Sequence, residues 1–564
     1  MEALDWLVIG VFFLALIGII VWVVRQKQND SADYFLGGRD ATWLAIGASI
    51  FASNIGSEHL IGLAGAGASS GMAMAHWEIQ GWMILILGWV FVPFYTRSMV
   101  YTMPEFLERR YNPQSRTILS VISLVSYVLT KVAVTVYAGG LVFQQVFGIK
   151  ELWGIDFFWI AAIGLVVLTA LYTIFGGMKS VLYTSVLQTP ILLLGSLIIL
   201  VLGFKELGGW DEMMRVCGAV TVNDYDDTMT NLIRSNDDAN FPWLGALIGS
   251  AIIGFWYWCT DQFIVQRVLS GKNEMEARRG TIFGAYLKLL PVFLFLIPGM
   301  IAFALHQKYI GAGSEGFLPM LANGTANADA AFPTLVAKLL PAGVKGLVVC
   351  GILAALMSSL ASLFNSSAML FTIDFYKRFR PETPEKKLVG IGQVATVVIV
   401  ILGILWIPIM RSVGDVLYTY LQDVQSVLAP GIAAAFLLGI CWKRTSAQGG
   451  MWGLIAGMVI GLTRLGAKVY YSNAGEVADS TFKYLFYDMN WLFFCGWMFL
   501  FCIIVVIVVS LATKAPTAEK IQGLVFGTAT KEQKAATRAS WNHWDIIHTV
   551  IILAITGAFY WYFW

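Results

Sequence analysis

The stretch from Phe51 to Leu60 (FASNIGSEHL) is a polar interruption in an apolar segment of about residues 43–75. It places Asn54, Glu58 and His59 where apolar side chains would be less costly. Such groups hydrogen-bond polar solutes, and carbonyls freed by a broken helix bind cations. Inside a bilayer no water satisfies freed backbone groups, so a break is tolerated where it lines a cavity or binds a ligand. This stretch is the leading candidate for a binding site.

Four further polar side chains stand in other apolar segments: Glu78, Lys131, Lys288 and Gln422. With the first stretch they supply donors and acceptors together, as sugar hydroxyls require. Taken singly, each also has a structural interpretation. Glu78 and Lys131 can pair or reach toward the surface, and Gln422 can join two helices. The whole set, more than any one member, favours a sugar site.

Aromatic residues near these groups offer faces that could stack on the apolar face of a pyranose. They are Trp77, Tyr257, Trp258 and Tyr418. Two of them precede a second polar interruption, Thr260 to Gln262, in the seventh apolar segment. This second interruption predicts another broken helix.

A serine-rich stretch, residues 354–367, lies in the ninth apolar segment and includes Ser358 and Ser359. Serines in membrane helices most often join neighbouring helices. The alternative is a sodium site, because a hard cation prefers oxygen ligands and hydroxyls can join backbone carbonyls of a broken helix. That alternative requires the serines to face the break at Ala52 to Ile55.

The composition indicates an all-α polytopic membrane protein, whose expected partner is the lipid bilayer. Of the 564 residues, 58% are hydrophobic and 13% charged, and the mean hydropathy is +0.72. A net charge of +2 offers no footprint for nucleic acid. The six cysteines show neither disulfide nor metal-site spacing. No nucleophile–base pair emerges, so we expect no enzyme.

About fourteen spans meet the length criterion of ~20 apolar residues. Basic residues are more frequent in the loops expected inside, which predicts that the N-terminus and the C-terminus both lie outside. The predicted location is the cell membrane, either a plasma membrane or a bacterial inner membrane.

The second and seventh spans carry the two interruptions and lie five spans apart. An odd repeat length inverts the second copy, which predicts two inverted five-helix repeats. The expected organisation is an N-terminal helix with an inner linker (1–42), a first repeat with an acidic outer loop (43–242), a second repeat (243–445) and accessory helices (446–564).

A glycine-rich run, Gly65–Gly71 (GAGASSG), resembles a dinucleotide-binding loop but has one residue too many and follows no strand. Close packing of helices through small residues is the better interpretation.

Seven blocks, in order and at similar spacing, resemble the sodium/solute symporter family, in particular its sodium/glucose cotransporter branch. They are Phe51–His59 (FASNIGSEH), Trp89–Pro93 (WVFVP), Thr102–Glu105 (TMPE), Trp256–Gln262 (WYWCTDQ), Ala355–Leu360 (ALMSSL), Phe371–Tyr376 (FTIDFY) and Cys441–Arg444 (CWKR). The resemblance implies a LeuT-like core of two inverted repeats with sugar bound at mid-membrane.

The resemblance also implies roles for individual residues. Those matching sugar-contacting positions are Asn54, His59, Glu78, Lys288 and Gln422, with Tyr257 as the inner gate and Trp258 beside it. Trp77 and Tyr418 are the further gate candidates. The implied sodium ligands are the carbonyls of Ala52, Ile55 and Ala355 and the hydroxyls of Ser358 and Ser359.

Three departures from the family pattern affect this assignment. Ser185 stands where many relatives have an acidic residue associated with a second cation site, which favours one sodium per sugar. Gly254 stands where relatives present a hydrogen-bonding side chain, and Gly81 lacks a polar one found in some. The identity of the sugar is therefore open.

The resulting expectation is a sodium-coupled symporter that imports a glucose-like or galactose-like monosaccharide by alternating access. The alternatives are a symporter of the same fold for inositol, sialic acid or an amino acid, and a sugar sensor that conducts sodium.

Overall fold

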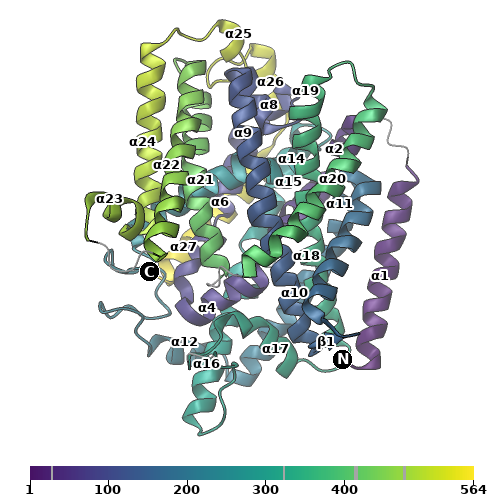
Figure 1. The fold of residues 1–564 in the computed structure, drawn as a ribbon, viewed down its shortest axis with the longest axis vertical. Coiled ribbons are helices and arrows are strands. Elements are labelled where there is room, and N and C mark those ends of the chain that lie inside the picture. The colour runs from purple at the N-terminus through teal and green to yellow at the C-terminus, as the bar shows by residue number, and fades with distance from the viewer. Residues whose placement is uncertain (27–29, 57, 322–323, 412–416, 474–477) are drawn as a thin grey trace.

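The computed structural model describes residues 1–26, 30–56, 58–321, 324–411, 417–473 and 478–564, apart from a few side chains within helices. These residues form a helical bundle (Figure 1), and the strands among them are β1 (Glu151–Leu152) and β2 (Ile155–Asp156), an antiparallel pair. The described part of the chain is thus built from helices, as expected from its composition.

The α-helices before residue 243 are α1 (Ala3–Val24), α2 (Ser31–Leu36), α3 (Trp43–Asn54), α4 (Ala64–Ser70), α5 (Ala75–Glu78), α6 (Gly81–Ile86), α7 (Val92–Ser98), α8 (Met103–Arg110), α9 (Pro113–Ser126), α10 (Ala133–Phe147), α11 (Phe157–Leu207) and α12 (Trp210–Gly218). Those from residue 243 onward are α13 (Trp243–Gly254), α14 (Gln262–Leu269), α15 (Glu274–Lys288), α16 (Ile297–Gly311), α17 (Ala331–Leu339), α18 (Val344–Met369), α19 (Lys377–Phe379), α20 (Glu385–Arg411), α21 (Leu417–Cys441), α22 (Ala447–Asn473), α23 (Thr481–Lys483), α24 (Trp491–Ala512), α25 (Ala518–Ile521), α26 (Lys531–Ala539) and α27 (His543–Tyr562).

Short segments of other helix types join many of these elements. The π-helical ones are η2 (Glu58–Leu63), η4 (Leu87–Phe91), η5 (Tyr127–Val132), η6 (Phe255–Thr260), η7 (Val292–Leu296), η9 (Leu370–Tyr376) and η10 (Tyr484–Asp488). The 3-10 ones are η1 (Gly37–Arg39), η3 (Gly71–Met74) and η8 (Ala328–Ala330). Since π-helical turns recur at functional sites, the segments η2, η5 and η6 direct attention to the middle of the bundle.

Eleven helical stretches in the described residues are long and apolar enough to cross a membrane, so the expected count of about fourteen spans is not confirmed. One reason is that two neighbouring expected spans form one helical stretch in the structure. In α11, Gly177 has a φ of 54° and reverses the chain between two expected spans. A side chain there would collide with the backbone of Tyr34, so glycine is required at this turn.

Both expected breaks are present. Helix α3 ends at Asn54, Ile55 is extended with φ −81° and ψ 108°, and η2 begins at Glu58. In the seventh span η6 ends at Thr260, Asp261 is extended with φ −76° and ψ 127°, and α14 follows. A polar interruption in an apolar run thus marks a helix break in both places.

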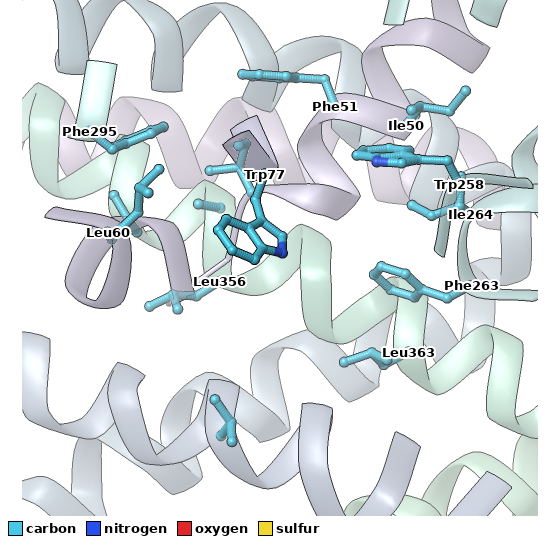
Figure 2. Packing of buried hydrophobic residues seen from close by; sticks show 14 of the residues in the cluster. Ile50, Phe51, Leu60, Trp77, Trp258, Phe263, Ile264, Phe295, Leu356 and Leu363 are labelled. Carbon is cyan, nitrogen blue, oxygen red and sulfur yellow. The ribbon is translucent and has the colours of Figure 1, made fainter. Parts of the chain in front are cut away.

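The glycine-rich run is a helix-packing surface, as its composition indicated. A Cβ on Gly67 would lie 2.2 Å from the carbonyl oxygen of Leu296, and one on Gly299 would lie 1.9 Å from that of Ala64. Helices α4 and α16 therefore cross at a distance that only glycine permits. Buried apolar side chains fill the surrounding core, including Phe51 before the first break and Phe263 just after the second (Figure 2).

The chain termini contact the loops expected outside. The Asp5 carboxylate accepts hydrogen bonds from the backbone of Gly343 and Gly346, at 2.7 and 2.8 Å. Near the other terminus, the Phe563 carbonyl accepts from the backbone of Leu232 at 3.1 Å. The side of a membrane on which each terminus lies stays a prediction.

Candidate functional site

A polar cavity is lined by residues next to both breaks. All seven residues expected to contact a sugar line it: Asn54, His59, Glu78, Tyr257, Trp258, Lys288 and Gln422. Trp77 and Ser359 line it as well. The side chain of Tyr418, the remaining gate candidate, lies outside the described residues. Residues distant in sequence thus converge on one polar cavity.

The charged centre of the lining is Glu78. Its Oε2 accepts a hydrogen bond from Lys288 Nζ at 2.6 Å and lies 3.3 Å from His59 Nε2. All three side chains are almost fully buried. His59 Nε2 also lies 3.4 Å from the amide nitrogen of Asn54. The lysine therefore neutralises the carboxylate within the protein, and α5, η2 and α15 are joined at this point.

Several polar atoms of the lining remain available to a ligand. Among the described residues, neither His59 Nδ1 nor Gln422 Oε1 has a hydrogen-bond partner, although both atoms are buried. Unpaired buried groups are costly, and a bound polar solute would supply the missing partners. For Gln422 this favours a ligand-binding role over the helix-joining role.

Aromatic rings form other parts of the wall. Tyr257 and Trp258 meet edge to face, with ring centroids 4.9 Å apart. Trp77 stacks on Trp491 of α24 at 5.5 Å, and Figure 2 shows Trp77 and Trp258 among the buried rings. Amphipathic walls of this kind suit a solute with both hydroxyl groups and an apolar face.

Lys131, which the sequence left between a structural and a functional role, is paired and also lines the cavity. Its Nζ donates to Asp261 Oδ2 at 2.7 Å, and Tyr127 donates to the other oxygen of Asp261. The same ammonium lies 4.7 Å from the ring centroid of Tyr257. Asp261 also accepts from the backbone of Phe263, so the ion pair fixes the start of α14 beneath the cavity.

The cavity also includes two polar residues that the sequence named without assigning a role, Glu58 and Lys131, and three that it did not single out, Gln80, Thr135 and Gln425. Gln80 had a detectable signal, since it lies two residues beyond Glu78. For Thr135 and Gln425 nothing in the local sequence indicated the site, because only tertiary packing brings them to it.

The serine-rich face of α18 packs against α3, as a sodium site at the first break would require. The hydroxyls of Ser53 and Ser362 lie 2.6 Å apart, and that of Ser358 lies 3.3 Å from that of Ser185. Ser359 lines the cavity. In this region serines therefore both join helices and stand close to the broken end of α3.

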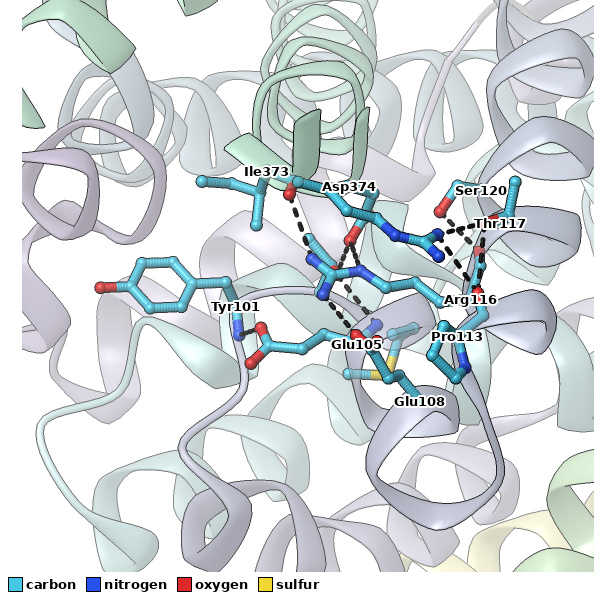
Figure 3. Close-up of polar contacts among 12 residues, drawn as sticks. Tyr101, Glu105, Glu108, Pro113, Arg116, Thr117, Ser120, Ile373 and Asp374 are labelled. Atoms are coloured by element: carbon cyan, nitrogen blue, oxygen red, sulfur yellow. Dashed lines mark hydrogen bonds and ion pairs between the residues drawn. The ribbon is translucent and has the colours of Figure 1, made fainter. Parts of the chain in front are cut away.

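At the end of the bundle expected to face the cell interior, Arg116 joins the two halves of the chain (Figure 3). It donates to Glu108 at 2.6 Å, to Asp374 at 2.7 Å and to the Ile373 carbonyl at 3.1 Å. Thr102 donates to the same Asp374 oxygen at 2.8 Å. Segments 102–116 and η9 are thus held together at this end of the bundle.

Two broken helices around a polar cavity, in a bundle of apolar helices, define a membrane transporter. The chain belongs to the sodium:solute symporter family, whose model matches residues 34–457. It is therefore a sodium-coupled solute transporter rather than an enzyme, as expected.

Relatives support this assignment, and a solved structure matches the fold. The chain is 37% identical over 542 residues to the sodium/myo-inositol cotransporter 2 of Mus musculus, covering 94% of this chain and 80% of that protein. It is 36% identical over 537 residues to the sodium/glucose cotransporter 4 of Danio rerio, covering 92% and 80%. A Na⁺-coupled sialic acid symporter in a substrate-bound outward-open state shares the fold, with a TM-score of 0.72, 21% identity, and coverage of 92% of this chain and 99% of that one.

Proposed function

We propose that the protein imports a neutral monosaccharide together with sodium, binding the sugar in the central cavity. The pairing of Glu78 with Lys288 carries this proposal. Because Lys288 and Lys131 both have carboxylate partners, the described residues of the lining offer no unpaired ammonium to an anionic solute. The unpartnered atoms of His59 and Gln422 match the donors and acceptors of hydroxyl groups.

The cyclic polyol myo-inositol is the second candidate. It is also a neutral, hydroxylated six-membered ring, and the name of the relative from Mus musculus favours it. A sialic acid carries a carboxylate, which the paired lysines do not favour. An amino acid would likewise bring a carboxylate.

Sodium binds at the first break in this proposal. Its ligands are the carbonyls of Ala52, Ile55 and Ala355 and the hydroxyls of Ser358 and Ser359. The support is the packing of α3 on α18, with Ser53 and Ser362 in contact beside this position. Ser185 supplies a hydroxyl rather than a carboxylate, which favours one sodium per sugar.

Coupling follows from differential affinity for two conformations. Sodium joins α3 to α18 and stabilises the conformation that is open to the outside and competent for sugar. Sugar then closes the outer side, and movement of Tyr257 opens the inner side. That step also requires the contacts of Arg116 with Asp374 to separate.

The test is sodium-driven uptake by purified protein in liposomes, with labelled glucose, galactose and myo-inositol competed by unlabelled sugars. Accumulation of a hexose under an inward sodium gradient supports the first candidate, and accumulation of myo-inositol alone supports the second. Sodium currents without accumulation of any of these solutes would instead indicate a sensor. Reversal potentials at varied sodium give the stoichiometry, with one sodium per sugar expected.

A further inference from the structure

Gln80 lies at the junction of two short helices in the cavity wall. Helix α5 ends at Glu78, and Gln80 precedes α6, with φ −83° and ψ 24°. Its side chain is 3% exposed and lines the cavity beside the glutamate. The side chain therefore reaches from the first half of the chain into the space next to the ligand-binding groups.

The amide of Gln80 has a defined orientation. One of its polar atoms lies 2.8 Å from the backbone carbonyl oxygen of Ser250 in α13. A carbonyl only accepts hydrogen bonds, so the atom facing it must be the nitrogen Nε2. The oxygen Oε1 is then left on the other side of the amide, and no hydrogen bond within the described residues engages it.

Gly254 leaves the space that this amide occupies. A Cβ on Gly254 would lie 2.5 Å from Gln80 Oε1 and 2.9 Å from its Cδ, too close for both to remain in place. Gly254 also lines the cavity. A polar group from α5–α6 thus fills the position that a side chain from α13 would otherwise take.

We propose that Gln80 is a specificity-determining residue whose Oε1 accepts a hydrogen bond from one hydroxyl group of the transported polyol, replacing a side chain at position 254. The proposal rests on the proposed function and adds a requirement to it. The hydroxyl at that position must donate, because Nε2 is committed to Ser250.

Because of this requirement, a ligand with a hydroxyl group at that ring position should bind better than an analogue with fluorine there. A deoxy-fluoro sugar keeps a weak acceptor at the substituted carbon but cannot donate. We expect one ring position at which fluorine is as harmful as hydrogen, weakening binding by roughly tenfold. In Gln80→Met, which keeps the length of the side chain, the parent polyol should bind roughly tenfold more weakly, and the difference between hydroxyl and fluorine at that position should disappear.

Two further variants control for structural effects. Gln393→Met removes a similar amide, which donates to the Ile174 carbonyl at 3.1 Å away from the cavity, and should leave the analogue profile unchanged. In the double variant Gln80→Ala/Gly254→Ser, a serine hydroxyl takes over the vacated space. Because a serine hydroxyl both donates and accepts, this variant should bind the fluorinated analogue better than the wild-type protein does.

Binding is measured by calorimetry on purified protein with saturating sodium, and uptake in liposomes is measured in parallel. A hydroxyl-to-fluorine penalty that persists in Gln80→Met, while uptake is intact, overturns the role of Gln80 and leaves the proposed function standing. Failure of every tested hexose and of myo-inositol to bind overturns both. A folded Gln80→Met protein that loses the penalty supports the proposal.

Discussion

Glu78 and Lys288 form a buried ion pair. Removing one member of such a pair costs more stability than replacing both members, because it leaves a buried charge without a partner. We expect Glu78→Gln to leave the ammonium without a counter-charge and to lower the free energy of unfolding by about 3–5 kcal/mol. The double variant Glu78→Gln/Lys288→Met should recover most of that stability but transport no sugar. Thermal unfolding in detergent checks both, and a Glu78→Gln protein as stable as wild type would contradict the prediction.

Gln422 offers a test of sugar recognition. We expect Gln422→Ala to raise the KM for the sugar by about tenfold, because a substrate hydroxyl loses its hydrogen-bond partner in a buried site. The sodium affinity should change little. Uptake at varied sugar and sodium measures the two constants separately, and an unaltered sugar affinity would remove Gln422 from the site.

Much of the candidate site was predictable because polar and charged residues stand within apolar segments of the sequence. Glu78 and Lys288 were recognisable because charges are costly in apolar segments. Glu78 was also a possible carboxylate partner for Lys288, and the folded bundle brings the two side chains within 2.6 Å although 210 residues separate them. Gln80 was not singled out, because its proposed role depends on the absent side chain of Gly254, which is a relation between two helices.

Substitution of a serine in helix α18 tests the proposed sodium site. We expect Ser359→Ala to lower the apparent sodium affinity while the variant still folds. Ser367→Ala is the matched control, since Ser367 is a buried serine two turns further along the same helix. Sodium titration of uptake separates them, and equal sodium dependence in the two variants would remove Ser359 from the proposed ligands.

Asp329, in the 3-10 segment η8, makes the stability of the folded protein depend on pH. Burial raises the pKa of Asp329 from 3.8 to about 6, and this carboxyl packs against Gly65 of α4. Because the pKa in the folded protein is raised, the protein is destabilised progressively as the pH rises from about 4 to about 6, reaching about 3 kcal/mol above that range.

We therefore expect Asp329→Asn to increase the melting temperature at pH 8 and to change it much less at pH 4.5. Thermal unfolding at the two pH values measures the difference. Asp237→Asn, on an exposed loop residue, is the control. An equal gain for Asp329→Asn at both pH values would show that ionisation of this carboxyl is not the cause.

Helix breaks were predictable, and helix limits were not. The two interruptions stood out because polar residues rarely occur within apolar runs, and both are breaks in the structure. The number of spans is not confirmed, because eleven described helical stretches meet the criteria of length and composition and one of them, α11, contains two expected spans. The reversal at Gly177 depends on a positive φ, and the close approach of Tyr34 explains it only once the fold is known.

In the proposed mechanism the whole molecule alternates between two conformations, and the contacts around Asp374 would oppose opening at the inner end. We expect Asp374→Asn to favour the inward-open state, because Arg116 and Thr102 lose a charged acceptor. Maleimide labelling of Cys259, which is buried in η6, should then accelerate in a variant that keeps this cysteine and lacks the other five.

Asp479→Asn breaks an ion pair with Lys483 elsewhere on the surface and serves as the control. Its labelling rate should match that of the parent variant. Unchanged labelling in Asp374→Asn would show that the contacts of Arg116 do not control the inner opening.

The family was predictable from seven short blocks, and the family match over residues 34–457 confirms it. The partner of Arg116 was not predictable, since 258 residues separate it from Asp374. The inverted repeats and the boundaries at 42, 242 and 445 stay predictions, because they describe a relation between halves rather than a local pattern.

The stacked pair of Trp77 and Trp491, with Trp258 nearby on the cavity wall, gives the molecule a built-in optical reporter. Indole emission responds to polarity and to neighbouring hydrogen bonds, and Trp77 Nε1 is buried without a partner in the described residues. A sugar entering beside it would change that environment. Difference spectra against Trp77→Phe would isolate this signal from the other 20 tryptophans of the chain, 21 in all, and would follow ligand entry in real time without any added dye.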